Sequence, residues 1–305
     1  MIDPLSDILS LLDVRAARCK RFEAGPPFAM RFPAKPALKF AAVLAGGCWI
    51  RLEGAEAVRL AAGDTFLLAD APPYILASDV TLAPEDGYAA YEGGRANGLH
   101  LRGADVRIVS GEFMIGSGSA DMLLKAISPF VHVSAGTGFA AVLRDTLAML
   151  DRELAGGEIG RALMARRMAD IALVQILRAH AHERKEKGAR WIGALADRRI
   201  AAALQCIHER PDHRWTVAEL ASASGMSRSV FAKRFDDLVG SPPLEYLRRW
   251  RLERAREALL DRGKSVTAIA LEAGYASESA FRNAFKRRFG LPPGRCRTRP
   301  TATHG

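Results

Sequence analysis

Side chains that can hydrogen-bond to the edges of nucleic-acid bases occupy matching places in two similar stretches of the sequence. The positions are Arg228, Ser229, Ala232 and Lys233 in the first stretch and Glu278, Ser279, Arg282 and Asn283 in the second. Lysine and arginine donate to guanine, asparagine pairs with adenine, glutamate accepts from cytosine, and a small apolar side chain contacts the thymine methyl. Farther along, Arg287 and Arg288 are typical of phosphate contacts, which fix register without reading sequence. These residues predict recognition of bases rather than bond-making chemistry.

The two stretches are copies of one pattern, from Trp215 to Pro243 and from Ser265 to Pro293. Matching pairs are Gly225 and Gly274, Gly240 and Gly290, Phe231 and Phe281, and Phe235 and Phe285. The offset is 49 residues at the first pair and 50 at the others, so the second copy has one extra residue in its turn. Each copy predicts a short helix, a glycine-containing turn and a second helix, over residues 216–239 and 265–289. This is the helix-turn-helix plan.

Local signals predict where these helices begin and end. Thr216 and Glu219 have the spacing of a capping box, and Gly225 ends the first helix where a left-handed residue is needed. Ser227, Ser265 and Ser277 are the other expected N-caps. The inner stripe of the second helix is expected at Val230, Phe231, Phe235 and Leu238. The N-terminal part of that helix is the part that meets base edges in the major groove.

A long helix over residues 243–260 is predicted to join the copies as a rigid spacer. Its expected buried stripe is Leu244, Leu247, Trp250, Leu252, Ala255 and Leu259. Residues 195–305 hold 21 Lys and Arg against 12 Asp and Glu, whereas the preceding 194 residues hold 23 against 22. A basic domain behind a nearly neutral one predicts an anionic polymer as partner. Double-stranded DNA fits better than an anionic membrane, because the predicted helices use their apolar faces for packing.

Residues 195–297 resemble the DNA-binding domain of AraC/XylS-type transcription regulators. The resemblance rests on the two copies, the joining helix and the run ALEAGYASESAFRNAFKRRFGLPPGRCR, residues 270–297. It implies two recognition helices on one face of the DNA, roughly 34 Å apart, and RNA polymerase as a partner. The sequence departs from the family pattern at Cys296, where an aromatic residue is usual, and at Ala232, where a longer base-reading side chain is common.

The first part of the chain is rich in short β-prone runs. Strands are expected at residues 39–44, 48–52, 56–60, 65–68, 74–77, 88–91 and 105–113, separated by turn signals. This spacing is typical of a small barrel or jelly roll. The run over residues 48–78 resembles the cupin-type sensing domain found at the front of many such regulators, here residues 1–119. The expected fold class is therefore α+β, a cupin-like barrel followed by helices and an all-α domain with two helix-turn-helix units.

Helical periodicity covers the rest of the chain. Helices are expected within residues 1–20, 122–130, 139–154 and 159–182. The apolar stripe of 159–182 is wide, which fits either a buried core helix or a subunit contact. Residues 120–190 are interpreted as a coupling or self-association region of a monomer or homodimer, and the charged run 182–190 as the domain boundary. Residues 298–305 are expected to form a polar tail.

A small-molecule effector is the expected ligand of the cupin-like domain. The candidate pocket residues are Trp49, Arg51, Phe66 and Tyr74. The alternative for Trp49 and Phe66 is that they only fill the core. No metal site is expected, because none of the seven His residues lies between residues 31 and 98, where cupin strands would supply ligands.

Other observations argue against other classes of protein. The longest uncharged apolar run, residues 40–50, is too short to cross a bilayer, and the acidic N-terminus lacks the basic start of a secretory signal. The four scattered cysteines fit reduced thiols in the cytoplasm. No catalytic residue, enzyme activity or cofactor is expected. Three alternatives stay open: a cupin enzyme with an accessory DNA-binding domain, a non-specific nucleic-acid binder, and a ligand-independent regulator whose barrel is a dimer scaffold.

Overall fold

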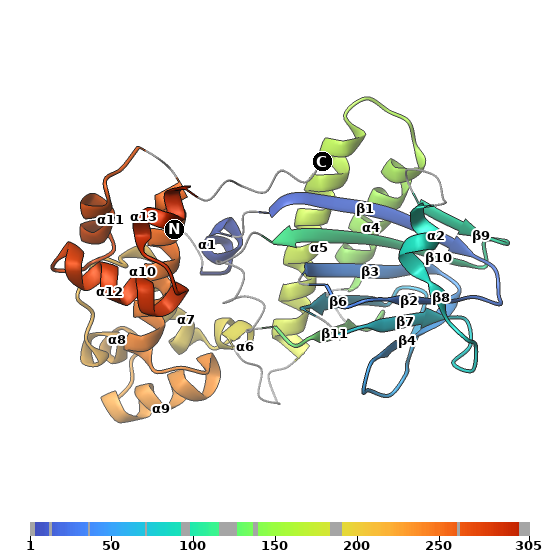
Figure 1. Ribbon diagram of the computed structural model, residues 1–305. Helices are drawn as coiled ribbons and strands as arrows, with labels where there is room; N and C mark the ends of the chain where they lie inside the picture. The colour runs from blue at the N-terminus through green and yellow to red at the C-terminus, as the bar shows by residue number, and fades with distance from the viewer. Residues whose placement is uncertain are drawn as a thin grey trace. The chain divides into compact units, whose positions relative to one another are not determined.

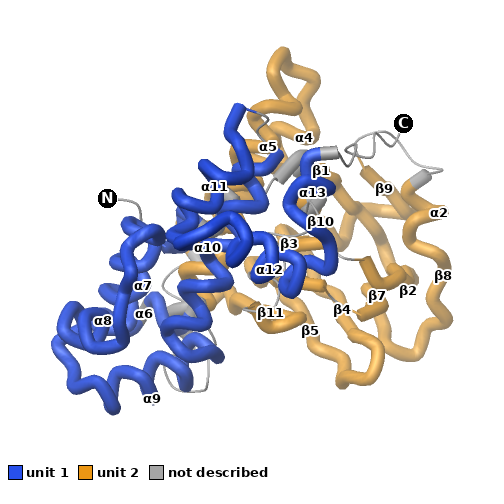
Figure 2. The backbone as a smooth tube through the Cα atoms, turned by 60° about the vertical axis from the view of Figure 1, so that its left-hand side comes forward, with its two compact units in different colours: residues 1–13, 117–123, 185–305 blue, residues 14–116, 124–184 orange. Residues whose placement is uncertain are grey.

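The computed structural model describes residues 4–11, 14–35, 37–70, 72–92, 98–115, 127–136, 140–183, 191–260 and 263–298. The chain forms two compact units (Figure 2). The β-rich unit contains residues 14–116 and 124–184, and the helical unit contains residues 1–13, 117–123 and 185–305. The start of the chain therefore belongs to the helical unit, whereas the sequence analysis assigned it to the cupin-like domain.

Two sheets form the β-rich unit, with strand orders β11-β6-β3-β10-β1-β9 and β5-β4-β7-β2-β8 (Figure 1). The strands are β1 (Val14–Ala24), β2 (Ala29–Phe32), β3 (Ala37–Ala45), β4 (Gly47–Leu52), β5 (Val58–Ala61), β6 (Thr65–Ala69), β7 (Tyr74–Ala77), β8 (Glu85–Asp86), β9 (Gly98–Leu101), β10 (Val106–Ile115) and β11 (Phe130–Val133). Neighbouring strands are antiparallel except for the pairs β1–β9 and β2–β8. This architecture confirms the predicted cupin-like β-domain.

Side-chain alternation along the strands decides which residues form the core of the β-rich unit. In β4, Cys48 and Ile50 are buried in this core, and Arg51 is exposed. In β10, Val106 and Ile108 belong to the core, so Arg107 between them lies on the opposite face of its sheet. This outer face of the six-stranded sheet is also largely apolar, with Phe40, Leu67 and Phe113 buried on it, and Arg107 adds a charge to that face.

Helices α4 (Ala140–Ala155) and α5 (Arg161–Glu183) contact strands of the six-stranded sheet and cover its outer face (Figure 1). Both helices confirm predicted ones. Met168, Leu173 and Ile176 of the wide α5 stripe are buried, as a core helix requires. Leu163 and Ile171 of the same stripe are 60% and 51% exposed, so the subunit-contact interpretation stays a prediction for that part.

The helical unit contains α1 and the helices that follow the β-rich unit. They are α1 (Pro4–Leu11), α6 (Trp191–Ala196), α7 (Arg198–Glu209), α8 (Val217–Ala223), α9 (Arg228–Val239), α10 (Pro243–Leu260), α11 (Val266–Glu272), α12 (Glu278–Phe289) and α13 (Pro293–Thr298). α1 contacts α6 and α7. In the part of the chain that the structure describes, no helix is long and apolar enough to span a bilayer.

Two secondary-structure predictions were wrong. The helix expected over residues 1–20 ends at Leu11, and β1 begins at Val14, because buried Phe22 and Ala24 alternate with charged residues at the period of a strand. Residues 88–91 form helix α2 (Gly87–Glu92) instead of a strand. The Asp86 carboxylate accepts the backbone N–H groups of Tyr88 and Ala89 at 2.8 and 3.1 Å, which starts a helix despite the β propensity of tyrosine.

Some predicted features were missed or lie outside the described residues. The short strands β2, β8, β9 and β11 were not predicted, and β11 begins at the last residue of the helix predicted for 122–130. Residues 122–126 of that predicted helix lie outside the described residues, as do residues 184–190 of the predicted boundary and residues 299–305 of the predicted tail.

Candidate nucleic-acid interface

The two helix-turn-helix units are α8 with α9 and α11 with α12, and their caps follow from the sequence. Thr216 and Glu219 form the predicted capping box, with the Thr216 N–H donating to the Glu219 carboxylate at 2.7 Å. The Ser265 and Ser277 hydroxyls accept the backbone N–H groups of Ala268 and Ala280 at 3.0 and 3.2 Å. Ser227 has the extended backbone of an N-cap without the predicted side-chain hydrogen bond. Three of the four predicted caps are therefore confirmed.

Glycine is required in both turns, for different reasons. Gly225 has φ +60° with open space around it, so the left-handed backbone alone selects glycine there. Gly274 has φ +73°, and a Cβ atom would in addition lie 2.9 Å from the Arg251 guanidinium and from the Asp212 carbonyl oxygen. The second turn therefore packs against the spacer helix and the loop before α8.

Matching phenylalanine pairs form the inner faces of the two recognition helices, α9 and α12. The rings of Phe231 and Phe235 lie 5.5 Å apart at 58°, and those of Phe281 and Phe285 lie 5.5 Å apart at 55°. All four side chains are fully buried. The two copies in the sequence are thus copies in three dimensions, each presenting the opposite face of its recognition helix to solvent.

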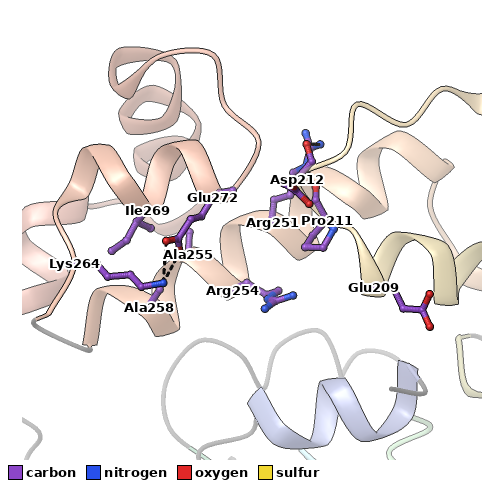
Figure 3. Close-up of a pocket in the computed structure, with 11 residues that line it drawn as sticks. Glu209, Pro211, Asp212, Arg251, Arg254, Ala255, Ala258, Lys264, Ile269 and Glu272 are labelled. Carbon is purple, nitrogen blue, oxygen red and sulfur yellow. Dashed lines mark hydrogen bonds and ion pairs between the residues drawn. The ribbon is translucent and has the colours of Figure 1, made fainter. Parts of the chain in front are cut away.

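The spacer helix α10 contacts α9, α11, α12 and α13, so it belongs to both halves of the helical unit. Arg251 of α10 donates from Nε to the Pro211 carbonyl oxygen at 2.5 Å and from a terminal nitrogen to the His213 carbonyl oxygen at 2.8 Å. A cavity of about 350 Å³ lies beside Arg251, and Lys264 and Glu272 pair at 2.7 Å in its lining (Figure 3). The hydrogen bonds of Arg251 join the loop before the first helix-turn-helix unit to the spacer helix.

Most of the predicted base-reading side chains are exposed on the recognition helices. The exposed ones are Arg228, Ser229 and Lys233 on α9 and Ser279, Arg282 and Asn283 on α12. Ala232 and Glu278 are half-buried. Val230, expected in the inner stripe of α9, is 56% exposed, and Leu244, expected in the buried stripe of α10, is 44% exposed. Those two expectations were wrong. The buried residues of α9 are Phe231, Phe235 and Val239, and Val230 does not lie on their face of the helix. In α10 the buried face passes through Pro243, Leu247 and Trp250 and leaves Leu244 outside it.

Glu278 and Arg282 are paired with each other. Arg282 donates from Nε to Glu278 Oε1 at 2.6 Å, across one turn of α12. Thr267 of α11 also donates its hydroxyl to the Glu278 carboxylate. These hydrogen bonds lower the pKa of Glu278, with that of Thr267 contributing most. A base contact by either side chain would use its remaining N–H groups or lone pairs, or compete with these bonds.

The two arginines predicted to contact phosphate differ. Arg287 is exposed, as a phosphate contact requires. Arg288 donates to Glu253 Oε1 of the spacer helix at 2.9 Å, and the Glu253 side chain is only 1% exposed. The sequence could not distinguish the two, because the buried partner of Arg288 lies 35 positions earlier in the chain. Arg288 has a structural role in the folded unit.

Asp197 attaches recognition helix α9 to α7. Its carboxylate caps α7 by accepting the backbone N–H groups of Arg199 and Ile200 at 3.0 and 3.1 Å, and it accepts Nε of Arg234 at 2.8 Å. Burial raises the pKa of Asp197, but the hydrogen bonds from Arg234 and the backbone outweigh burial and hold the pKa below its ordinary value. Sequence analysis missed this residue, although an Asp directly before a helix is a cap signal.

We expect Asp197→Asn to lower the free energy of unfolding of the helical unit near neutral pH by about 1 kcal/mol. A carboxylate with a lowered folded pKa stabilises the fold above its unfolded pKa of about 3.9, and this contribution is lost as pH falls through the folded pKa. The variant should therefore lose less stability than the wild type on acidification. Urea unfolding at several pH values measures both slopes, with Asp237→Asn, an exposed α9 carboxylate, as the control. Equal slopes for Asp197→Asn and wild type would contradict the prediction.

The four predicted effector-pocket residues do not line one pocket. Phe66 and Tyr74 belong to the core between the sheets. Trp49 and Arg51 alternate with the core residues of β4 and therefore lie on its other face, where the Arg59 guanidinium lies 5.7 Å from the Trp49 ring centroid. Within the described ranges, no group of three His, Cys, Asp or Glu side chains could hold a metal ion.

Comparison with known proteins decides the family. The cupin family matches residues 3–182, and the helix-turn-helix domain family matches residues 220–299. Putative AraC-like transcription regulators from Streptomyces lividans and Streptomyces antibioticus are each 40% identical to this chain, over 98% of its length and 99% of theirs. The chain belongs to the AraC-like transcription regulators. This AraC-like protein is therefore a DNA-binding transcription regulator with an N-terminal cupin domain.

A solved structure also matches the DNA-binding part of this AraC-like regulator. The DNA-binding domain of AdpA, a global transcriptional factor crystallised with a target DNA, is 33% identical, with a TM-score of 0.31. It covers 32% of this chain and 88% of that one. Membership of this family, and not the structural match, makes DNA the partner of the helical unit, which agrees with the predicted anionic polymer.

Proposed function

We propose that this regulator binds a DNA site with two unlike halves, one read by α9 and one by α12. The observation that supports the proposal is duplicated geometry with different exposed side chains. Lys233 stands on α9, whereas Arg282 and Asn283 stand on α12. One chain therefore has two different recognition helices, joined through the spacer helix α10. Its DNA site need not be a palindrome.

Each reader has a proposed chemical role. Lys233 and Arg282 donate to guanine, and Asn283 pairs with adenine. Val230, which the sequence analysis placed in the core, is an exposed apolar side chain suited to a thymine methyl. Glu278 accepts from cytosine with the carboxylate lone pairs that Arg282 and Thr267 do not use. α12 has three charged or amide readers, Glu278, Arg282 and Asn283, whereas α9 has two, Arg228 and Lys233, so α12 contributes more of the specificity.

We expect Lys233→Ala, Arg282→Ala and Asn283→Ala each to relax discrimination at particular base pairs, by about 1–3 kcal/mol per contact. Selection of bound sites from random DNA measures the effect. The control is Arg287→Ala, which should weaken all sequences alike and reduce the salt dependence of binding, because a phosphate contact releases counterions. If all three variants selected the wild-type motif, the assignment of these readers would be wrong.

The cupin domain is proposed to sense a small-molecule effector and the DNA-bound regulator to act on RNA polymerase, in the cytoplasm and without catalysis. The family and the two-unit architecture support this. A second function, a dimer scaffold, is supported by exposed apolar side chains on α4 and α5, including Val142, Leu163 and Ile171. Genome-wide footprinting would identify the regulated genes, and through them the pathway of the effector.

A further inference from the structure

A cavity of about 500 Å³ lies between the outer face of the six-stranded sheet and α4. Small side chains leave this space open, with Ala42 and Thr65 on the sheet and Ala148 on the helix. Leu44 and Leu147 add apolar lining. The volume falls within the range of small-molecule sites, about 300–1,000 Å³.

Among the described residues, the cavities on the inner side of the same sheet are, by contrast, small. The cavity beside Phe66 and Lys39 measures about 20 Å³. That is room for about one water molecule. An effector inside the barrel would have to displace core side chains, whereas the outer cavity is already open.

Arginine side chains surround the outer cavity. Arg107 comes from β10, and Arg144 and Arg152 come from α4, four residues before and after Ala148, so they share one face of the helix. The carboxylate in the lining, Asp151, accepts Arg21 Nε at 2.7 Å. This bond compensates its charge, and the three arginines of the lining leave an excess of positive charge.

Arg107 is incompletely bonded within the part of the chain that the structure describes. Its Nε is buried, and its ion-pair contact with Asp151 Oδ2 is 3.7 Å long, beyond hydrogen-bond distance. A buried N–H group without an acceptor is costly, by about 1–3 kcal/mol. An anionic oxygen in the cavity would supply an acceptor.

We propose that this cavity binds a small organic carboxylate with an apolar body, as the effector of the regulator. The inference rests on the effector role proposed above and gives that effector a chemical class. Guanidinium groups bind carboxylates with two parallel hydrogen bonds. The apolar lining takes the hydrocarbon part, and burying a more highly charged phosphate against it would cost more.

Such a ligand would bridge the sheet and the helix. Contacts to Arg107 on one side and to Arg144 and Arg152 on the other hold α4 to the sheet. α4 contacts α5, and α5 is the last element of the β-rich unit before the chain continues to the DNA-binding residues. The bound state therefore differs from the free state in the attachment of this helix pair, the kind of differential contact that regulation requires.

Calorimetric titration of the full chain without DNA tests the site, with octanoate and benzoate as probes. We expect at least one of them to bind with a Kd of about 1 mM or tighter, and its uncharged amide to bind at least about 10-fold more weakly. Inorganic phosphate, as the second anion, should bind more weakly than the carboxylate.

Two variants test the site by independent means. Arg144→Gln with Arg152→Gln should weaken octanoate or benzoate about 10-fold or more. Ala148→Leu should do the same by filling the cavity without changing charge. Arg51→Gln, an exposed arginine of the other sheet, is the matched control and should bind as the wild type does. Circular dichroism establishes that each variant is folded.

Several results would overturn the proposal: no binding of either carboxylate, equal binding of the amides, tighter binding of phosphate, or unchanged binding by both cavity variants. DNA binding is measured separately by fluorescence anisotropy. Loss of specific DNA recognition with intact, arginine-dependent carboxylate binding would contradict the proposed function and leave the site standing. Specific DNA recognition without arginine-dependent carboxylate binding would contradict the proposed site and leave the proposed DNA-binding function standing.

Discussion

Arg288→Ala is expected to lower the free energy of unfolding of the DNA-binding unit by about 3–5 kcal/mol. The Glu253 carboxylate is 1% exposed and accepts a hydrogen bond from Arg288 at 2.9 Å. Removing the guanidinium leaves a negative charge buried in the spacer helix with its arginine gone. Chemical unfolding followed by hydrogen exchange of α10 and α12 amides measures the loss and its location.

Arg287→Ala is the matched control for this prediction. The two arginines are neighbours on α12, but Arg287 is exposed. Its replacement should leave the stability of the unit within about 0.5 kcal/mol of wild type. A double variant, Glu253→Gln with Arg288→Ala, should recover part of the lost stability, because it removes the buried charge. Equal stabilities of the two single variants would show that the Glu253–Arg288 pair contributes little.

His208→Ala is expected to destabilise the same unit by about 2–4 kcal/mol. The imidazole is fully buried, with Nδ1 2.9 Å from Asp7 Oδ2 of α1 and Nε2 2.7 Å from the Tyr246 hydroxyl. Its ring centroid lies 4.0 Å from that of Trp250. The substitution removes two hydrogen bonds and leaves a cavity beside Trp250, whose fluorescence reports the change.

Variants at Asp7 separate the contribution of α1 from that of the cavity. Asp7→Ala removes one partner of His208 without touching the core and should cost about 1–2 kcal/mol, with Asp7→Asn costing less. Hydrogen exchange should show the loss in α7 amides of the helical unit. If Asp7→Ala changed only the exchange of the β-rich unit, the docking of α1 on α7 would be wrong.

The sequence predicted most of what repeats or alternates in this chain. Turn glycines, the capping box and the Phe231–Phe235 spacing are local signals, and each copy of the helix-turn-helix supported the other. The strand expected at residues 88–91 was wrong because one side chain, Asp86, starts a helix there. Local propensity is a weak guide where a single cap decides the outcome.

The wrong predictions at the candidate sites were caused by contacts between residues that are far apart in the sequence. Glu253 lies 35 positions before Arg288, and nothing in the sequence near Arg288 distinguishes it from Arg287. The effector pocket was expected among aromatic residues of the strands. Side-chain alternation, however, puts Phe66 in the core between the two sheets and Trp49 on the face of its own sheet that points away from this core. The outer cavity is open because the side chains of Ala42 and Ala148 are small. An alanine in a strand or helix carries no sequence pattern that would predict a cavity.

The docking of α1 also determines when the DNA-binding unit can be completed during synthesis. Asp7 leaves the ribosome 201 positions before its partner His208. At typical elongation rates of about 5–20 residues per second, roughly 10–40 s pass between the synthesis of α1 and the synthesis of α7, to which it binds. During that interval the β-rich unit, which begins at Val14, has time to form. Helix α1 is therefore synthesised before the β-rich unit but completes its packing after that unit has had time to form.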